Sequence, residues 1–168
     1  MKIVKFLFLF LCISGFAQSK VGTVDIDFII SKMPELPAAQ LQIETYGKGL
    51  DADLNKKLQA YNEIIEAYKA GQAGYTEELK VQKQQEIASA EQDINKFQQN
   101  GTQLVNIKRD EVLRPLYAKI GDALDKVSKA EAYTQVFQID NSLVYLDNNY
   151  DLTLKVLKEL GIEVKEGE

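Results

Sequence analysis

The chain has 168 residues, of which 25 are acidic and 20 basic, so its formal net charge at pH 7 is −5, and it contains no histidine. The absence of histidine excludes Ser-His-Asp and Cys-His nucleophiles and zinc sites built on histidine. An acidic balance without a concentrated basic face excludes the usual footprint of a nucleic-acid-binding protein. We therefore predict a protein that is not an enzyme and that holds no cofactor or metal.

The first 17 residues have the pattern of a secretory signal peptide. Lys2 and Lys5 give a positive start, residues 6–13 form an apolar run, and small residues precede a cleavage site after Ala17. A membrane anchor is the alternative, but the apolar run is much shorter than the roughly 20 residues that a spanning helix needs. Cleavage would remove Cys12, the single cysteine, so we expect packing alone to hold the exported protein together.

A short strand is predicted next, over residues 20–27, because β-branched residues there alternate with others. Residues 28–30 then lead into a helical turn, and Pro34 and Pro37 break the pattern. We assign residues 18–35 to the first part of a small body.

A long helical segment follows, over about residues 38–70 and again from Thr76. Its apolar residues are spaced by 4, 4, 3, 4 and 3 positions in the first run and by 3, 4, 3, 4 and 3 in the second, as in a coiled-coil seam. The first seam is Leu50, Leu54, Leu58, Tyr61, Ile65 and Tyr68, and the second is Ile87, Ala90, Ile94, Phe97, Gly101 and Leu104. Gly71 and Gly74 interrupt the pattern between the runs. We predict an antiparallel helical hairpin over residues 36–130, an arm of roughly 45 Å with its tip at these two glycines.

The pattern changes again after the hairpin. Residues 133–139 and 142–146 alternate with period two on either side of the turn pair Asp140-Asn141, which predicts a β-hairpin. Asp151 is expected to cap a final helix, and Gly161 is expected to end it.

The predicted fold class is therefore mainly α with a small β body (α+β). A long antiparallel coiled-coil hairpin, residues 36–130, is inserted into a short-stranded sheet formed by residues 18–35 and 131–168. Three short strands are a thin sheet for one chain to stabilise alone. We therefore expect the body to associate with copies of itself.

Three segments of the chain resemble the Skp/OmpH family of periplasmic chaperones. They are KVGTVD at residues 20–25, LVYLD at residues 143–147 and DLTLKVL at residues 151–157. In that family an N-terminal strand, a late hairpin and an aspartate-led helix flank a helical arm in this order. The resemblance implies a periplasmic homotrimer whose three arms enclose a cavity for unfolded outer-membrane proteins in transit, without a cofactor.

A structural coiled-coil spacer of the cell envelope is the alternative, since it needs the same helices but no affinity for unfolded chains. Removing the signal peptide takes away two of the 20 basic residues and no acid, so 18 basic and 25 acidic residues leave a net charge of −7. The arm is nearly neutral. Binding of anionic lipid or lipopolysaccharide, which suits basic members of the family, is therefore not expected here.

Apolar residues off the seam are the candidates for contact with a client, namely Ile64 on the first helix and Val81 on the second. Gly47, Gly49 and Gly101 fall at nearly the same height of the arm, and glycine weakens a helix. We predict a hinge at this height. The alternative is that the glycines permit the two helices to approach closely.

The acidic segment from Asp147 to Asp151 imitates the start of a calcium loop. Leu152 and Lys158 stand where such a loop needs glycine and glutamate, so we interpret the segment as a turn followed by a helix cap. Neither this segment nor any carboxylate pair in the chain is expected to form a metal or catalytic site.

Overall fold

The computed structural model describes residues 19–164, so the predicted signal peptide lies outside the described residues. The chain folds into two compact units and crosses between them twice, at Leu36–Pro37 and at Pro115–Leu116. We call the unit from Pro37 to Pro115 the arm. The other unit, residues 19–36 together with 116–164, is called the body. The prediction of a mainly helical fold with a small sheet is confirmed.

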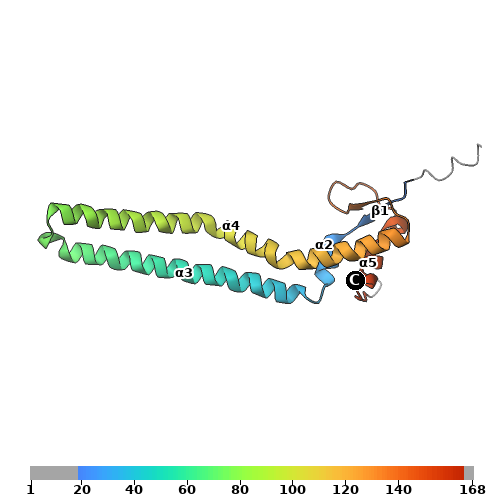
Figure 1. Ribbon diagram of the computed structural model, residues 1–168, viewed down its shortest axis with the longest axis horizontal. Helices are drawn as coiled ribbons and strands as arrows, with labels where there is room; N and C mark the ends of the chain where they lie inside the picture. Colours follow the sequence, from blue (N-terminus) through green and yellow to red (C-terminus); the bar gives the residue numbers. More distant parts are fainter. Residues whose placement is uncertain (1–18, 165–168) are drawn as a thin grey trace, which may run out of the picture. The chain divides into compact units, whose positions relative to one another are not determined.

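The arm is built from two long helices that run antiparallel (Figure 1). They are α3 (Leu36–Gly71) and α4 (Glu77–Ala130), joined by the short helix η2 (Gln72–Gly74). The predicted seam residues are the less exposed positions of both helices, and Ile94 is buried. The helical hairpin that the heptad spacing predicts is thus confirmed.

The tip of the arm is a closely packed turn. The Tyr75 hydroxyl donates a hydrogen bond to the Ala67 carbonyl oxygen at 3.3 Å, and its ring lies 6.1 Å from that of Tyr68. A side chain at Gly71 would overlap the Tyr75 ring, which explains why glycine stands there. Thr76 caps α4 as predicted, because its hydroxyl accepts a hydrogen bond from a backbone N–H of the first turn.

The sheet of the body has two parallel strands. They are β1 (Val21–Val24) and β2 (Gln135–Gln138), with Val21 opposite Gln135, and the described residues add only an isolated bridge between Thr23 and Asp151. The helix α2 (Ile26–Lys32) follows β1 directly. Its N-cap is Asp25, whose carboxylate accepts a hydrogen bond from the backbone N–H of Phe28 at 2.8 Å.

The predicted β-hairpin is wrong in its second half. Residues 142–146 form no strand, and β2 pairs with the distant β1 rather than with its neighbour in sequence. The physical reason lies at the turn, where the Asp140 carboxylate accepts hydrogen bonds from both the backbone N–H and the hydroxyl of Ser142. This local turn takes the N–H that an antiparallel ladder would use. Alternation alone does not identify the partner of a strand.

The core of the body is formed where the C-terminal half of α4 meets α2 and the last helix, α5 (Thr153–Glu159). The predicted final helix is present, with the Asp151 carboxylate accepting from the backbone N–H of Thr153 at 2.9 Å and Gly161 ending the helix at φ 74°. The largest fully buried side chains are Val24, Ile29, Ile120, Leu152, Val156 and Leu157. The body therefore begins inside α4, at Leu116, and not at residue 131.

Candidate interaction surfaces

The arm carries apolar side chains that project into solvent. Val81, predicted from its position off the seam, is 53% exposed, whereas the other candidate, Ile64, is half-buried. Sequence reasoning missed two more exposed residues, Leu41 at 62% and Ile107 at 54%. Both are apolar residues that lie off the seam, which is the same sequence pattern that identified Val81. These side chains give the arm several separate apolar contact points.

The three predicted hinge glycines lie inside the arm helices. A Cβ atom added at Gly47, Gly49 or Gly101 would have no heavy atom within 4 Å beyond the helix's own backbone. Close approach of the two helices therefore does not explain why these positions are glycine. The hinge remains a prediction.

The same glycines leave two hollows in the arm surface. Gly49 lines one of about 600 Å³ together with Leu41, Tyr46 and Leu50. Gly47 and Gly101 line a second of about 350 Å³, whose apolar wall includes Leu50, Leu54, Phe97 and Val105. Because the glycines have no side chains, apolar groups of the seam are accessible there.

The body exposes a second apolar surface next to its sheet. Val144 is 99% exposed and Tyr145 is 81% exposed, in the segment that was predicted to be a strand. Phe137 on β2 is also exposed, and among the described residues β2 pairs on one edge only. A free strand edge beside large exposed apolar side chains is a surface that soluble proteins normally cover.

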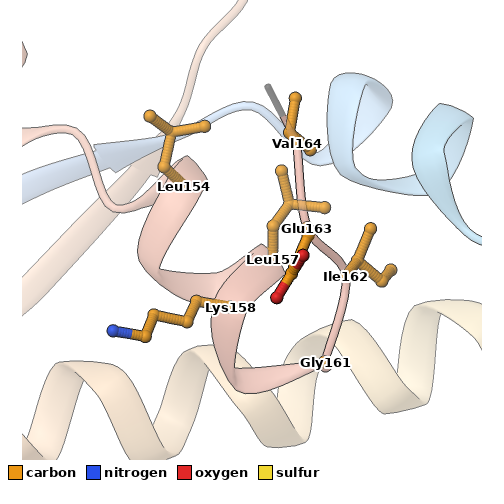
Figure 2. Close-up of a pocket in the computed structure, with 7 residues that line it drawn as sticks. All are labelled: Leu154, Leu157, Lys158, Gly161, Ile162, Glu163 and Val164. Atoms are coloured by element: carbon orange, nitrogen blue, oxygen red, sulfur yellow. The ribbon is translucent and has the colours of Figure 1, made fainter. Parts of the chain in front are cut away.

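A hollow of about 480 Å³ lies beside α5 (Figure 2). Figure 2 shows Leu154 and Leu157 on α5, and Ile162 and Val164 on the segment that follows Gly161. Leu154 is more than half exposed. The hollow adds apolar area to the surface of the body.

The charged residues of the body form a network that ties the chain's first strand to the end of α4. The Lys20 ammonium donates a hydrogen bond to the Glu131 carbonyl oxygen at 3.0 Å and lies 3.8 Å from the centre of the Tyr133 ring. The Glu131 carboxylate also pairs with Lys155 at 2.6 Å. The hydrogen bond from Lys155 lowers the pKa of Glu131, and the same bond raises the pKa of Lys155. These contacts join the residue before β1, the end of α4 and α5.

The acidic residues considered for metal binding have structural partners instead. Asp147 accepts from the backbone N–H of Asn149 at 3.0 Å, and Asp151 accepts from the backbone N–H of Thr153, the first residue of α5. The N-cap position of α5 is Leu152, one residue later than the predicted Asp151. Within residues 19–164 no group of three or more metal-binding side chains comes together. In the same part of the chain, no helix combines the length and the apolar character needed to cross a membrane.

The comparisons with known proteins agree with this architecture. The sequence model of the family described as outer membrane protein (OmpH-like) matches residues 20–160. A search of the curated proteins gave no match. The fold resembles the crystal structure of a candidate outer membrane chaperone (OmpH-like) from Caulobacter crescentus CB15, with a TM-score of 0.64 and 13% identity, over 92% of this chain and 96% of that one. The family match spans both strands, the arm and α5, and the chain therefore belongs to the OmpH-like family, which supports a chaperone-like role and a periplasmic location.

Proposed function

We propose that the protein is a periplasmic holdase that binds unfolded outer-membrane proteins between the arms of a homotrimer. The observation that carries this proposal is the arm itself, a long helical hairpin with exposed apolar side chains at Leu41, Val81 and Ile107. A holdase needs many weak contacts and no chemistry. Separate apolar contact points on a nearly neutral arm meet this requirement.

The strength of each contact fits holding and release. Burying a whole aliphatic side chain contributes about 1.5–3 kcal/mol, and these side chains are already partly covered, so each contributes less. The lysines of the arm helices are mostly paired with acids three or four positions away, as in Lys48–Glu44 and Lys80–Glu77. Such pairs keep strong charge–charge attraction to a client low.

Self-association is supported by the body. Residues 142–146 keep the alternation of a strand, yet they have no pairing partner within the described chain. The second edge of β2 also has no strand paired with it within the described chain. In a pair of chains, residues 142–146 of one chain can add to the free edge of β2 in the other. This pairing would bury Val144 or Tyr145 against Phe137. When each chain receives a segment from one neighbour and donates its own segment to the next, the chains form a closed ring. The resemblance to the family implies that this ring contains three chains.

The experiment that tests the holdase proposal measures light scattering by an unfolded outer-membrane β-barrel protein diluted from denaturant. The mature protein is expected to suppress the aggregation. A variant with Leu41→Ser, Val81→Ser and Ile107→Ser should hold the client about tenfold more weakly or worse, because three apolar contacts are lost.

The matched control replaces three exposed glutamines of the arm, as Gln40→Ser, Gln82→Ser and Gln99→Ser, and should hold the client like the unchanged protein. If the unchanged protein does not slow aggregation at all, the proposal is wrong and the coiled-coil spacer is the better interpretation. If the apolar variant holds clients as well as the control, the exposed apolar residues are not the holding surface.

A further inference from the structure

Both places where the chain crosses between body and arm contain a proline. The first crossing is Leu36–Pro37 and the second is Pro115–Leu116. The described residues contain one other proline, Pro34, which lies in the connection between α2 and α3. The two crossing prolines stand in different helical contexts, and this difference decides what each of them does.

Pro37 is the second residue of α3. In the first turn of a helix the backbone N–H groups have no partner within the helix, so a proline there removes no hydrogen bond. Pro115 lies deep inside α4, which continues without a break from Glu77 to Ala130. There the missing N–H leaves the carbonyl of Glu111 without its helical donor, and the proline ring crowds that carbonyl. The hydrogen-bond ladder of α4 is thus interrupted at the boundary between the two units.

The helix is firmly held on the body side of this interruption. Leu116 and Ala123 are buried, and Ile120 is only 1% exposed. One turn beyond Pro115, Lys119 pairs at 2.6 Å with Glu35, in the connection that leads into α3. The hydrogen bond from Lys119 also lowers the pKa of Glu35. The body therefore fixes α4 from Leu116 onward.

The arm side of Pro115 is held less tightly. Val112 and Leu113 are only half-buried, and Glu111 pairs with Lys108 of its own helix. Packing that resists bending therefore falls off at the same residue at which the backbone ladder is interrupted. A sharp bend in a helix almost always has such a local cause, and proline is the commonest.

We propose that Pro115 is a joint at which the arm bends as a unit against the body. Pro37 at the other crossing is passive, because α3 starts there and has no ladder to interrupt. The joint is a property of the chain and stands whether or not the arm holds clients. It is also distinct from the predicted glycine hinge, whose residues lie within the arm.

The test measures the distribution of distances between two spin labels, one in the body and one in the arm. The chain after residue 17 contains no cysteine, so labels attach only where cysteine is introduced. Asp122→Cys in the body and Gln92→Cys in the arm are exposed positions for which no polar contact is seen. Doubly labelled chains are diluted tenfold with unlabelled chains, so that only distances within one chain are recorded.

Pro115→Ala restores the N–H and should narrow this distribution about twofold. It should also slow amide hydrogen exchange over residues 115–119 by about 100-fold. Pro37→Ala is the matched control and should leave both measurements unchanged. A second label pair within the arm, Asn55→Cys with Gln92→Cys, should not respond to Pro115→Ala.

Three results would each overturn the joint. The first is a distribution of body-to-arm distances that is as broad in Pro115→Ala as in the unchanged protein. This result would show that Pro115 does not increase bending. The second is an equal narrowing by Pro37→Ala. The third is a narrowing of the pair within the arm, which would show that Pro115→Ala stiffens the whole helix and not one joint.

Discussion

Gly22 in β1 shows how closely the body is packed around a single position. A Cβ atom there would lie 2.5 Å from the Leu152 side chain and 2.7 Å from the Tyr133 ring, and all three residues are buried. Glycine at this position is therefore a packing requirement. Gly121 in α4 is the opposite case, since an added Cβ there has no neighbour within 4 Å.

Gly22→Ala is therefore expected to destabilise the protein by about 1–3 kcal/mol, because the added methyl group must displace two core side chains. Gly121→Ala is the control and should stabilise it by about 0.5–1 kcal/mol, because alanine restricts the unfolded chain and favours the helix. Urea unfolding of both variants measures the difference. A stabilising Gly22→Ala would contradict the packing described for the core.

The network of Lys20, Glu131 and Lys155 makes stability depend on pH at both ends of the range. The pKa of Glu131 lies below its ordinary value of 4.5, so its contribution is full above pH 4.5 and is lost as the pH falls through the lowered pKa. The pKa of Lys155 lies above its ordinary value of 10.5, so its contribution is full below pH 10.5 and is lost as the pH rises through the raised pKa.

Glu131→Gln is expected to remove both dependences. Its deficit in unfolding free energy should be constant between pH 4.5 and 10.5 and should shrink outside this window. Because the side chains of Glu131 and Lys155 are partly exposed, the deficit should also shrink in high salt. Urea midpoints at several pH values measure the effect, and Lys126→Gln, which breaks a different ion pair of the body, serves as the control. A deficit that grows below pH 4.5 would contradict the assignment.

Three glycines lower the stability of the arm helices without an obvious packing benefit. Gly47, Gly49 and Gly101 gain no close contact from lacking a side chain, and they open two hollows in the seam. A helix weakened at one height bends there more easily than elsewhere. A hinge within the arm is the interpretation that remains.

Replacing all three glycines by alanine should stabilise the arm by about 0.8–1 kcal/mol per position. Small-angle scattering should then show a narrower spread of arm positions than in the unchanged protein. Gly74→Ala at the tip, where an added Cβ also meets nothing, is the control for a glycine outside the hinge. An unchanged spread in the triple variant would reject the hinge, even if stability rises.

The helices were predictable because their signals are local. The heptad spacing, the cap at Thr76 and the glycine turn lie within a few residues of the structure that they specify. The sheet was not predictable in this way, since β2 pairs with a strand more than one hundred residues away and alternation carries no information about the partner. Leu41 and Ile107 also lie off the seam, but the sequence does not show which off-seam residues the partner helix covers, so their exposure was not predicted.

The arm and the body expose apolar surface in different ways: the arm at separate points, and the body at neighbouring residues beside a strand edge. The arm buries its seam within one chain. The body leaves Val144 and Tyr145 in solvent and an edge of β2 unpaired within the described residues. The association of several bodies proposed above would cover this surface without involving the arm.

If the proposed trimer forms through this surface, Val144→Asp combined with Tyr145→Asp is expected to shift the protein from trimer to monomer at micromolar concentration. Charges at these positions must be desolvated if the segment packs against a neighbouring body. Sedimentation velocity measures the change in mass, and Val81→Asp on the arm is the control that should stay trimeric. A double variant that remains trimeric would place the interface elsewhere.

The pairing of β1 with β2 also dictates an order of events. Val21 pairs with Gln135, which lies 114 residues later in the chain, so the first strand to be synthesised has no partner until most of the chain has emerged. The arm has no such delay, because its helices form within about a microsecond and are joined by a short connection, residues 72–76. During synthesis or export the arm can therefore fold while β1 is still unpaired, and the body is the last part to fold. The proposed association of several chains through the body would then follow the pairing of β1 with β2, so an incomplete chain would not yet offer the finished sheet to its neighbours.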